Sequence, residues 1–177
     1  AALKEADANG FTAVPLGVRV KGRFPTTVEK VVSQNVVGMV EGSDPALKAE
    51  AVLFTAHWDH LGVGRAVLGD SIYNGAADNA TGCGLLLELA RAWAALPAKP
   101  KRSAVFLAVT AEEKGLLGSK FYAAHPVVPL GRTALNLNFD MILPLGKFES
   151  VVLDGADRTT AWPIVRAAAE ANGLAVE

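Results

Sequence analysis

The chain has 177 residues, which suffices for one domain with a sizeable core, and 17 Lys and Arg nearly balance 18 Asp and Glu. Without a basic block, this balance argues against nucleic acid or an anionic membrane surface as a partner. Although 51% of the residues are hydrophobic, no apolar run approaches the ~18 residues that indicate a membrane span. The single cysteine, Cys83, excludes an internal disulfide and a cysteine-rich zinc site.

The N-terminal part predicts a connecting segment followed by strands. Residues 1–16 are mixed in composition, contain Pro15 and indicate a linker or an edge segment. Residues 18–21, 26–32 and 35–40 are rich in β-branched side chains, which favours antiparallel strands that lead into the core. The sequence Gly-Ser-Asp-Pro at 42–45 then predicts a turn.

Buried strands and amphipathic helices alternate in the rest of the chain. Short apolar runs predict buried strands at Val52–Ala56, Ser103–Val109 and Thr133–Phe139 and a further short strand at Val151–Leu153. Helical spacing of apolar residues predicts helices over residues 80–96, 116–124 and 158–171, the last capped by Asn172-Gly173. The glycine-rich residues between His57 and Asn79 predict no regular structure.

This alternation predicts an α/β fold, a three-layer sandwich with a mixed, mostly parallel central sheet and antiparallel additions at its edge. We treat residues 1–177 as a single domain. Both ends look cut, because Ala1 is not a Met and residues 174–177 resemble a strand that is just beginning. The expectation is therefore a piece of a larger protein whose domain lacks its C-terminal part.

Polar side chains follow three of the predicted buried strands. His57 and Asp59 follow the first, Glu112 and Glu113 the second, and Asp140 the third. In open α/β sheets, ligands bind at the carboxyl ends of the strands. A histidine and carboxylates that converge at one sheet edge describe a metal site.

Each of these residues also has an ordinary explanation. His57 alone suits a hydrogen-bonded structural histidine, and Asp59 suits either a surface residue or a partner that orients the His57 ring. Asp78 precedes a predicted helix, where aspartate commonly serves as a cap. The pair Glu112-Glu113 suits a solvated surface, and Asp140 has the same ambiguity.

Taken together, four blocks resemble the M28 family of zinc aminopeptidases in their order and spacing. The blocks are His57-Trp58-Asp59, residues 75–82 (GAADNATG), residues 112–119 (EEKGLLGS) and residues 138–141 (NFDM). The resemblance covers roughly residues 30–145. The sequence His60-Leu61-Gly62 further resembles members that carry an inserted protease-associated domain.

The resemblance implies a dinuclear zinc site. Asp78 would bridge two zinc ions, His57 and Asp140 would complete the protein ligands of the first ion, and Glu113 would hold the second. Glu112 would be the general base and Asp59 would orient His57. In this family the peptide bond after the bridging aspartate is often cis, which implies a cis bond after Asp78. Nitrogen and oxygen ligands suit zinc without excluding cobalt or manganese.

One feature of the family is missing. The resemblance implies a second-ion histidine downstream of Asp140, with a nearby tyrosine that stabilises the oxyanion, but the histidines here are His57, His60 and His125. His125 indicates a cap or a surface residue, whereas His60 is a weak candidate ligand. We therefore expect this chain to bind one ion passably and the second weakly and to be inactive or nearly so by itself, while the intact parent protein is expected to be active.

Two classes of function follow. The first is the central part of a secreted or periplasmic metallo-aminopeptidase that acts on peptides; this location is implied by the resemblance alone. The second is a non-catalytic interaction module on the same fold. A carboxypeptidase or a glutaminyl cyclase is a nearer alternative, which uses the same site for another reaction. The retained set of His57, Asp78, Glu113 and Asp140 favours the enzyme.

Overall fold

The computed structural model describes residues 12, 15–142 and 146–176 and divides into two units, residues 1–31 and 32–177. In the first unit, the described residues 15–31 contain neither helix nor strand, and all of them are exposed. The predicted strands at 18–21 and 26–32 are therefore wrong, because these β-branched residues pair with no other strand. The predicted linker at 1–16 lies almost wholly outside the described residues.

A four-stranded sheet forms the centre of the second unit, with strand order β1-β5-β2-β6. The strands are β1 (Val36–Val40), β2 (Ala51–His57), β5 (Ser103–Val109) and β6 (Thr133–Asn138). The central strand β2 pairs in parallel with both β5 and β6, while β1 is antiparallel to β5. A mostly parallel sheet with an antiparallel edge is thus confirmed, as are the predicted strands at 35–40, 52–56, 103–109 and 133–139.

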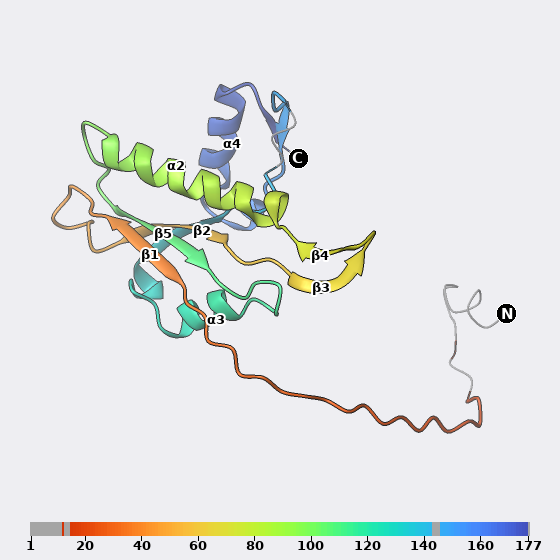
Figure 1. The fold of residues 1–177 in the computed structure, drawn as a ribbon. Coiled ribbons are helices and arrows are strands. Elements are labelled where there is room, and N and C mark those ends of the chain that lie inside the picture. The colour runs from red at the N-terminus through yellow and green to blue at the C-terminus, as the bar shows by residue number, and fades with distance from the viewer. Residues whose placement is uncertain (1–11, 13–14, 143–145, 177) are drawn as a thin grey trace. The chain divides into compact units, whose positions relative to one another are not determined.

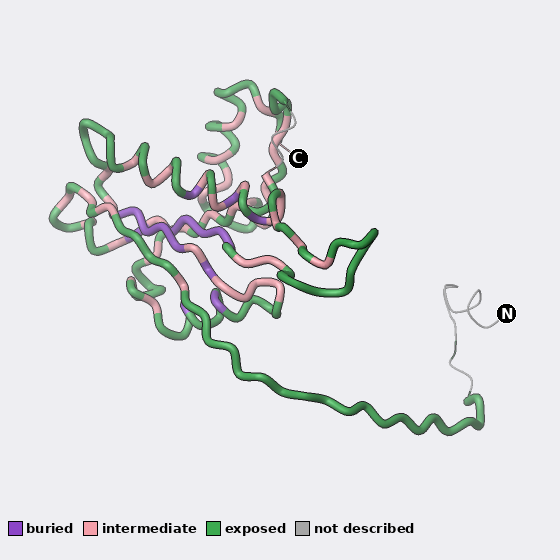
Figure 2. The backbone as a smooth tube through the Cα atoms, viewed as in Figure 1, coloured by how far each residue is buried: buried purple, intermediate pink, exposed green. Residues whose placement is uncertain are grey.

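Helices cover the two faces of this sheet (Figure 1). Helix α2 (Thr81–Ala95) packs Leu86 against Phe54 and Phe106 on one face. Helix α3 (Leu117–Ala124) places Tyr122 against the opposite face. The three-layer arrangement is therefore confirmed, and burial concentrates in β2 and β5 (Figure 2). These two strands are mostly apolar because a strand covered on both faces has no solvated side.

A β-hairpin lies where no regular structure was predicted. Strands β3 (Gly62–Val67) and β4 (Asp70–Tyr73) pair antiparallel, with Val67 opposite Asp70. The two turn residues, Leu68 and Gly69, have φ values of 53° and 91°. Positive φ at both positions matches the twist of a two-residue hairpin. The prediction failed because this turn lacks the Asn-Gly or Asp-Gly sequence that usually reveals such hairpins.

The last elements are smaller. Strands β7 (Ser150–Val151) and β8 (Ala175–Val176) form a two-stranded parallel sheet, and helix α4 (Trp162–Ala171) packs against β8. The short turns are η1 (Ala76–Ala80), η2 (Leu130–Arg132) and η3 (Ala156–Arg158). Helix α4 begins later than predicted, at a Pro in its first turn, which is a favoured helix start. Among the described residues, no helix is long and apolar enough to cross a bilayer.

Candidate metal centre

His57 is the last residue of β2 and is only 2% exposed, because β5 and β6 flank the strand. Its Nδ1 lies 2.9 Å from the main-chain oxygen of Asp59. A carbonyl oxygen only accepts, so Nδ1 carries the proton and Nε2 is left to face the site. Nε2 lies 3.0 Å from Asp78 Oδ1 and 3.4 Å from Asp140 Oδ1. A neutral His57 would therefore place a lone pair against two carboxylates, an arrangement that calls for a shared cation.

The electrostatics of His57 agree with this arrangement. Burial has the largest single effect and lowers its pKa, but the hydrogen bond to the Asp59 carbonyl and the nearby carboxylates outweigh burial. The net result is that the pKa of His57 is raised above its ordinary value. The surrounding acids thus favour positive charge at this point, which a metal ion would supply.

Asp59 acts on two neighbours through different atoms. Its main-chain carbonyl holds the His57 ring, while its carboxylate Oδ1 lies 3.8 Å from His57 Nδ1, beyond hydrogen-bond distance. The same Oδ1 accepts a hydrogen bond from the main-chain N–H of Glu112 at 3.1 Å. The carboxylate therefore links the end of β2 to the loop that follows β5.

Asp78 lies in the irregular turn η1, directly before α2, and its peptide bond to Asn79 is cis, as the family resemblance implies. Asn79 is only 2% exposed and fixes this turn to the end of β6. Its Nδ2 donates to the carbonyl of Phe139 at 2.9 Å. Its Oδ1 accepts from the N–H groups of Gly82 at 3.0 Å and Met141 at 3.3 Å. One buried amide therefore sets the spacing between Asp78 and Asp140.

The loop after β5 carries Glu112 and Glu113. Asn35, which precedes β1, holds both ends of this loop: its Oδ1 accepts from the N–H of Thr110 at 3.1 Å, and its Nδ2 donates to the carbonyl of Gly118 at 2.8 Å. Burial raises the pKa of the Glu112 carboxyl, and neighbouring acids add to this effect against an opposing contribution from the nearby histidine. Glu112 also lines a cleft that His57 and Asp140 share.

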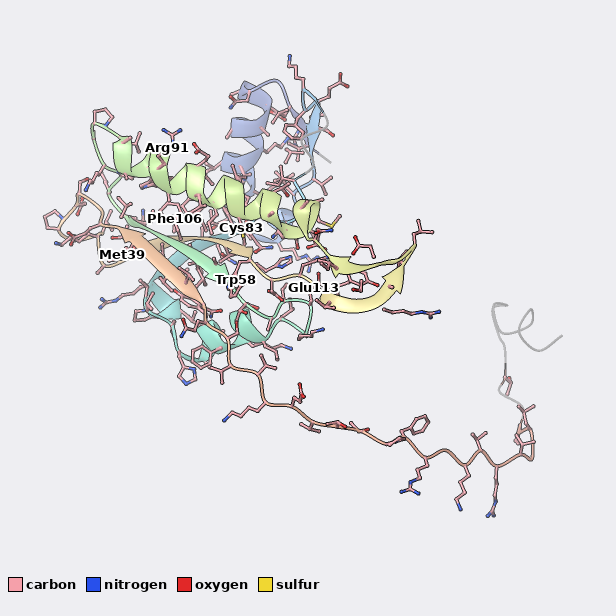
Figure 3. The ribbon with its side chains drawn as sticks, viewed as in Figure 1. Met39, Trp58, Cys83, Arg91, Phe106 and Glu113 are labelled. Atoms are coloured by element: carbon pink, nitrogen blue, oxygen red, sulfur yellow. The ribbon has the colours of Figure 1, made fainter. Side chains whose placement is uncertain are left out.

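His60 joins Glu113 on the other side of Asp78. Its Nδ1 lies 2.8 Å from Glu113 Oε1 and 3.7 Å from Asp78 Oδ2. Among the residues that the structure describes, neither His60 Nδ1 nor Glu113 Oε1 has a hydrogen-bond partner, although both atoms are buried. Trp58 and Glu113 are labelled at the end of the central sheet from which the β3–β4 hairpin projects (Figure 3).

Two groups of donor atoms thus meet at one residue. We call His57, Asp78 and Asp140 the first group, and His60, Asp78 and Glu113 the second group; within each, the donor atoms lie within 4.8 Å of one another. Asp78 directs Oδ1 to the first group and Oδ2 to the second. Imidazole and carboxylate donors suit divalent zinc. With unpaired buried donors in the second group, these residues fit a pair of divalent ions.

The structure therefore brings His57, Asp78, Glu113 and Asp140 to one edge, with Glu112 and Asp59 beside them. His125 lies apart at the end of α3, where its Nδ1 is 3.2 Å from the carbonyl oxygen of Phe121. Sequence reasoning gave His60 little weight and did not single out Asn79 or Asn35. Their importance depends on contacts between segments that are distant in the sequence, and no local sequence pattern predicts such contacts.

Comparison with known proteins identifies relatives over this same region. The model of peptidase family M28 matches residues 35–177. Aminopeptidase YwaD of Bacillus subtilis is 32% identical over 147 residues, covering 80% of this chain and 30% of that protein. The probable leucine aminopeptidase 2 of Aspergillus oryzae is 34% identical over 141 residues, covering 79% of this chain and 24% of that protein. The chain thus spans less than a third of the length of these curated relatives.

Solved structures give the same picture. A peptidase M28 precursor from Shewanella amazonensis is 30% identical with a TM-score of 0.59, over 80% of this chain and 29% of that one. A Zn-dependent exopeptidase from Parabacteroides distasonis is 25% identical with a TM-score of 0.58, over 81% of this chain and 55% of that one. A glutaminyl cyclase from Porphyromonas gingivalis, 20% identical with a TM-score of 0.60 over 80% of this chain and 53% of that one, shares the fold.

Proposed function

The chain belongs to peptidase family M28, and from this premise we propose that it supplies the metal-binding part of a zinc aminopeptidase that removes N-terminal residues from peptides. The curated relatives named as aminopeptidases support this reaction. The proposal concerns the whole protein, because the matched relatives are more than three times as long as the matched segment. A secreted or periplasmic location belongs to the same proposal and rests on the family resemblance.

The division of the Asp78 carboxylate between the two groups carries the proposal. One oxygen lies 3.0 Å from His57 Nε2, and the other lies 3.7 Å from His60 Nδ1. A carboxylate that serves two donor groups is suited to bridge two ions. The Parabacteroides distasonis neighbour, described as a Zn-dependent exopeptidase, supports zinc as the metal.

When bound, two zinc ions would lower the pKa of a shared water and polarise the substrate carbonyl. The residues of the chain would supply the remaining chemistry. Glu112, which lines the cleft beside His57 and Asp140, would take the proton of the attacking water and pass it to the leaving amine. Its raised pKa suits this exchange, because a base works best when its pKa approaches the working pH. The carboxylates around the site would attract the free amine of the substrate.

The test is Glu112→Gln in the full-length, zinc-loaded protein, assayed with a panel of aminoacyl-anilides. We expect kcat to fall by about 10²–10⁴, the usual contribution of a general base, while zinc content measured by mass spectrometry stays unchanged. Glu149→Gln is the matched control, because Glu149 is exposed and lies outside both donor groups. It should retain wild-type kcat and zinc.

Other outcomes are equally informative. Loss of zinc in Glu112→Gln would mean that the roles of Glu112 and Glu113 are exchanged. A wild-type protein that neither binds zinc nor hydrolyses any anilide would contradict the aminopeptidase and favour an interaction module. Cyclisation of N-terminal glutaminyl peptides, or cleavage from the C-terminus, would replace the aminopeptidase with a cyclase or a carboxypeptidase.

A further inference from the structure

We propose that His60 is a metal ligand, which binds the second ion through Nδ1 together with Asp78 Oδ2 and Glu113 Oε1. This inference rests on the proposed function only to the extent that the site binds divalent metal. It changes the expected ligand count of the second position from two to three. Three protein ligands are the usual number in catalytic zinc sites.

The distances fit coordination. Zinc bonds to nitrogen and oxygen of about 2.0–2.2 Å place two ligand atoms of a tetrahedral site roughly 3.4 Å apart. His60 Nδ1 lies 2.8 Å from Glu113 Oε1 and 3.7 Å from Asp78 Oδ2, which bracket that separation. All three donor atoms lie within 4.8 Å of one another. A small adjustment of side chains would therefore place one ion among the three donors.

The contact between His60 and Glu113 is not an ordinary hydrogen bond. At 2.8 Å it has the distance of an ion pair, yet within the described part of the chain neither Nδ1 nor Oε1 has a hydrogen-bond partner. Both atoms are buried, and buried polar atoms almost always have a partner. Two potential metal-ligating atoms that lie close together without a hydrogen bond between them are suited to bind the same ion.

The fold holds His60 in this position. The β3–β4 hairpin begins two residues after His60 and returns the chain to Gly75, three residues before Asp78. A Cβ atom at Gly75 would lie 2.7 Å from the Cβ of His60, and Gly75 has a φ of +67°, a conformation that favours glycine. Close packing of His60 on Gly75 therefore ties its ring to the turn that carries Asp78.

The consequence is a second position with three ligands from residues 60–113, namely His60, Asp78 and Glu113. The family resemblance implies a histidine downstream of Asp140, and this chain has none there. With His60 as a ligand, the chain would hold two ions without that residue. The expectation of a weak second position would then be replaced by two positions with three protein ligands each.

The experiment is a titration of the metal-free chain with Co²⁺ and, separately, with Zn²⁺. Calorimetry monitors both titrations, and the visible absorption of Co²⁺ monitors the first. The wild-type chain should bind two ions. His60→Ala should still bind one ion tightly but should lose at least about 100-fold in affinity for the other ion. Such a loss exceeds what residues that only hydrogen-bond to metal ligands usually contribute. The visible spectrum of bound Co²⁺ should also change. His125→Ala, a histidine outside both donor groups, should behave as wild type. Circular dichroism checks that each variant folds.

A second variant separates ligation from positioning. The amide of His60→Gln can still hydrogen-bond Glu113 but lacks the imidazole nitrogen. Ligation predicts that His60→Gln loses the second ion as His60→Ala does, whereas unchanged binding in either variant would overturn the inference and leave the proposed function intact. If the wild-type chain and the full-length protein both bind no metal at either position, the inference and the proposed function fail together.

Discussion

The two donor groups share Asp78 but rest on different parts of the fold. In the first group, His57 is the end of a strand paired on both sides, and its ring is oriented by a main-chain carbonyl. In the second group, His60 and Glu113 both lie in loops, and neither buried donor atom has a hydrogen-bond partner. The donors of the first group are therefore held by strand pairing and hydrogen bonds, whereas those of the second group are held by loop packing alone and would gain partners only from an ion.

This difference has a physical consequence for metal binding. Donors that are already held in place lose little freedom when the ion arrives, while loop donors must be ordered at that moment. Unpaired donors also become satisfied only when an ion is bound. We therefore expect the first group to fill at lower metal concentration and the second group to gain more local order on filling. The following variants test this comparison.

The largest effect is expected from Asp78→Asn, which keeps the shape of the side chain and removes its charge. Because Asp78 belongs to both groups, the affinity for each ion should fall by more than ~100-fold. That is the largest loss usually seen for residues that only hydrogen-bond to metal ligands. Calorimetric titration of the metal-free chain measures this. Asp157→Asn, an exposed residue outside both groups, is the control. Unchanged affinity at either position would show that Asp78 does not serve that position.

An intermediate effect, confined to the first group, is expected at Asp59. The His57 ring is held by the Asp59 main-chain carbonyl, so Asp59→Asn and Asp59→Ala should each change first-ion affinity by less than about tenfold, below the usual range for a carboxylate partner. Asp59→Ala also removes the acceptor of the Glu112 N–H and should lower kcat of the full-length enzyme, whereas Asp59→Asn keeps that acceptor.

Metal titrations and kcat measurements on the two variants decide this point. A 100-fold loss of the first ion in both would show that the carboxylate, rather than the carbonyl, orients His57. Equal kcat in Asp59→Ala and Asp59→Asn would show that the hydrogen bond to the Glu112 N–H does not matter for turnover.

The smallest effect concerns Cys83, which lies behind the first group and donates from Sγ to the main-chain oxygen of His57 at 3.2 Å. Burial raises the pKa of the Cys83 thiol, and the charge of Asp59 adds to the shift. Only the thiolate reacts with disulfide reagents. Labelling of the folded chain at neutral pH should thus be slower than in denaturant, and its rate should keep rising as the pH increases through the raised pKa. Equal rates in both states would mean that the thiol is open to solvent.

The central fold could be predicted because its strands are unusually clear. Both β2 and β5 are seven residues long and covered on both faces, so continuous apolar runs mark them. The strands predicted at 18–21 and 26–32 failed for the opposite reason, since β-branched composition indicates a strand only where a partner is present. The hairpin was missed because the Leu68-Gly69 turn carries no common turn sequence.

The site divides in a similar way. His57, Glu112, Glu113 and Asp140 could be selected because each lies at the end of a buried strand or within a few residues of it, and Asp78 because it belongs to a recognisable block. His60 could not be separated from an ordinary loop histidine, since its significance lies in distances to Glu113 and Asp78. Asn79 resembles a common helix-start residue, and only the structure reveals its hydrogen bonds to Phe139 and Met141.

Gly82 shows how little space separates α2 from the end of β6. A Cβ atom there would collide with the Asn79 side-chain oxygen and with the carbonyl of Phe139. Even alanine would force the helix and the strand apart, and with them the segments that carry Asp78 and Asp140. The first turn of α2 therefore sets the separation of Asp78 and Asp140, and a larger residue at position 82 would widen the first donor group without replacing any of its donor atoms.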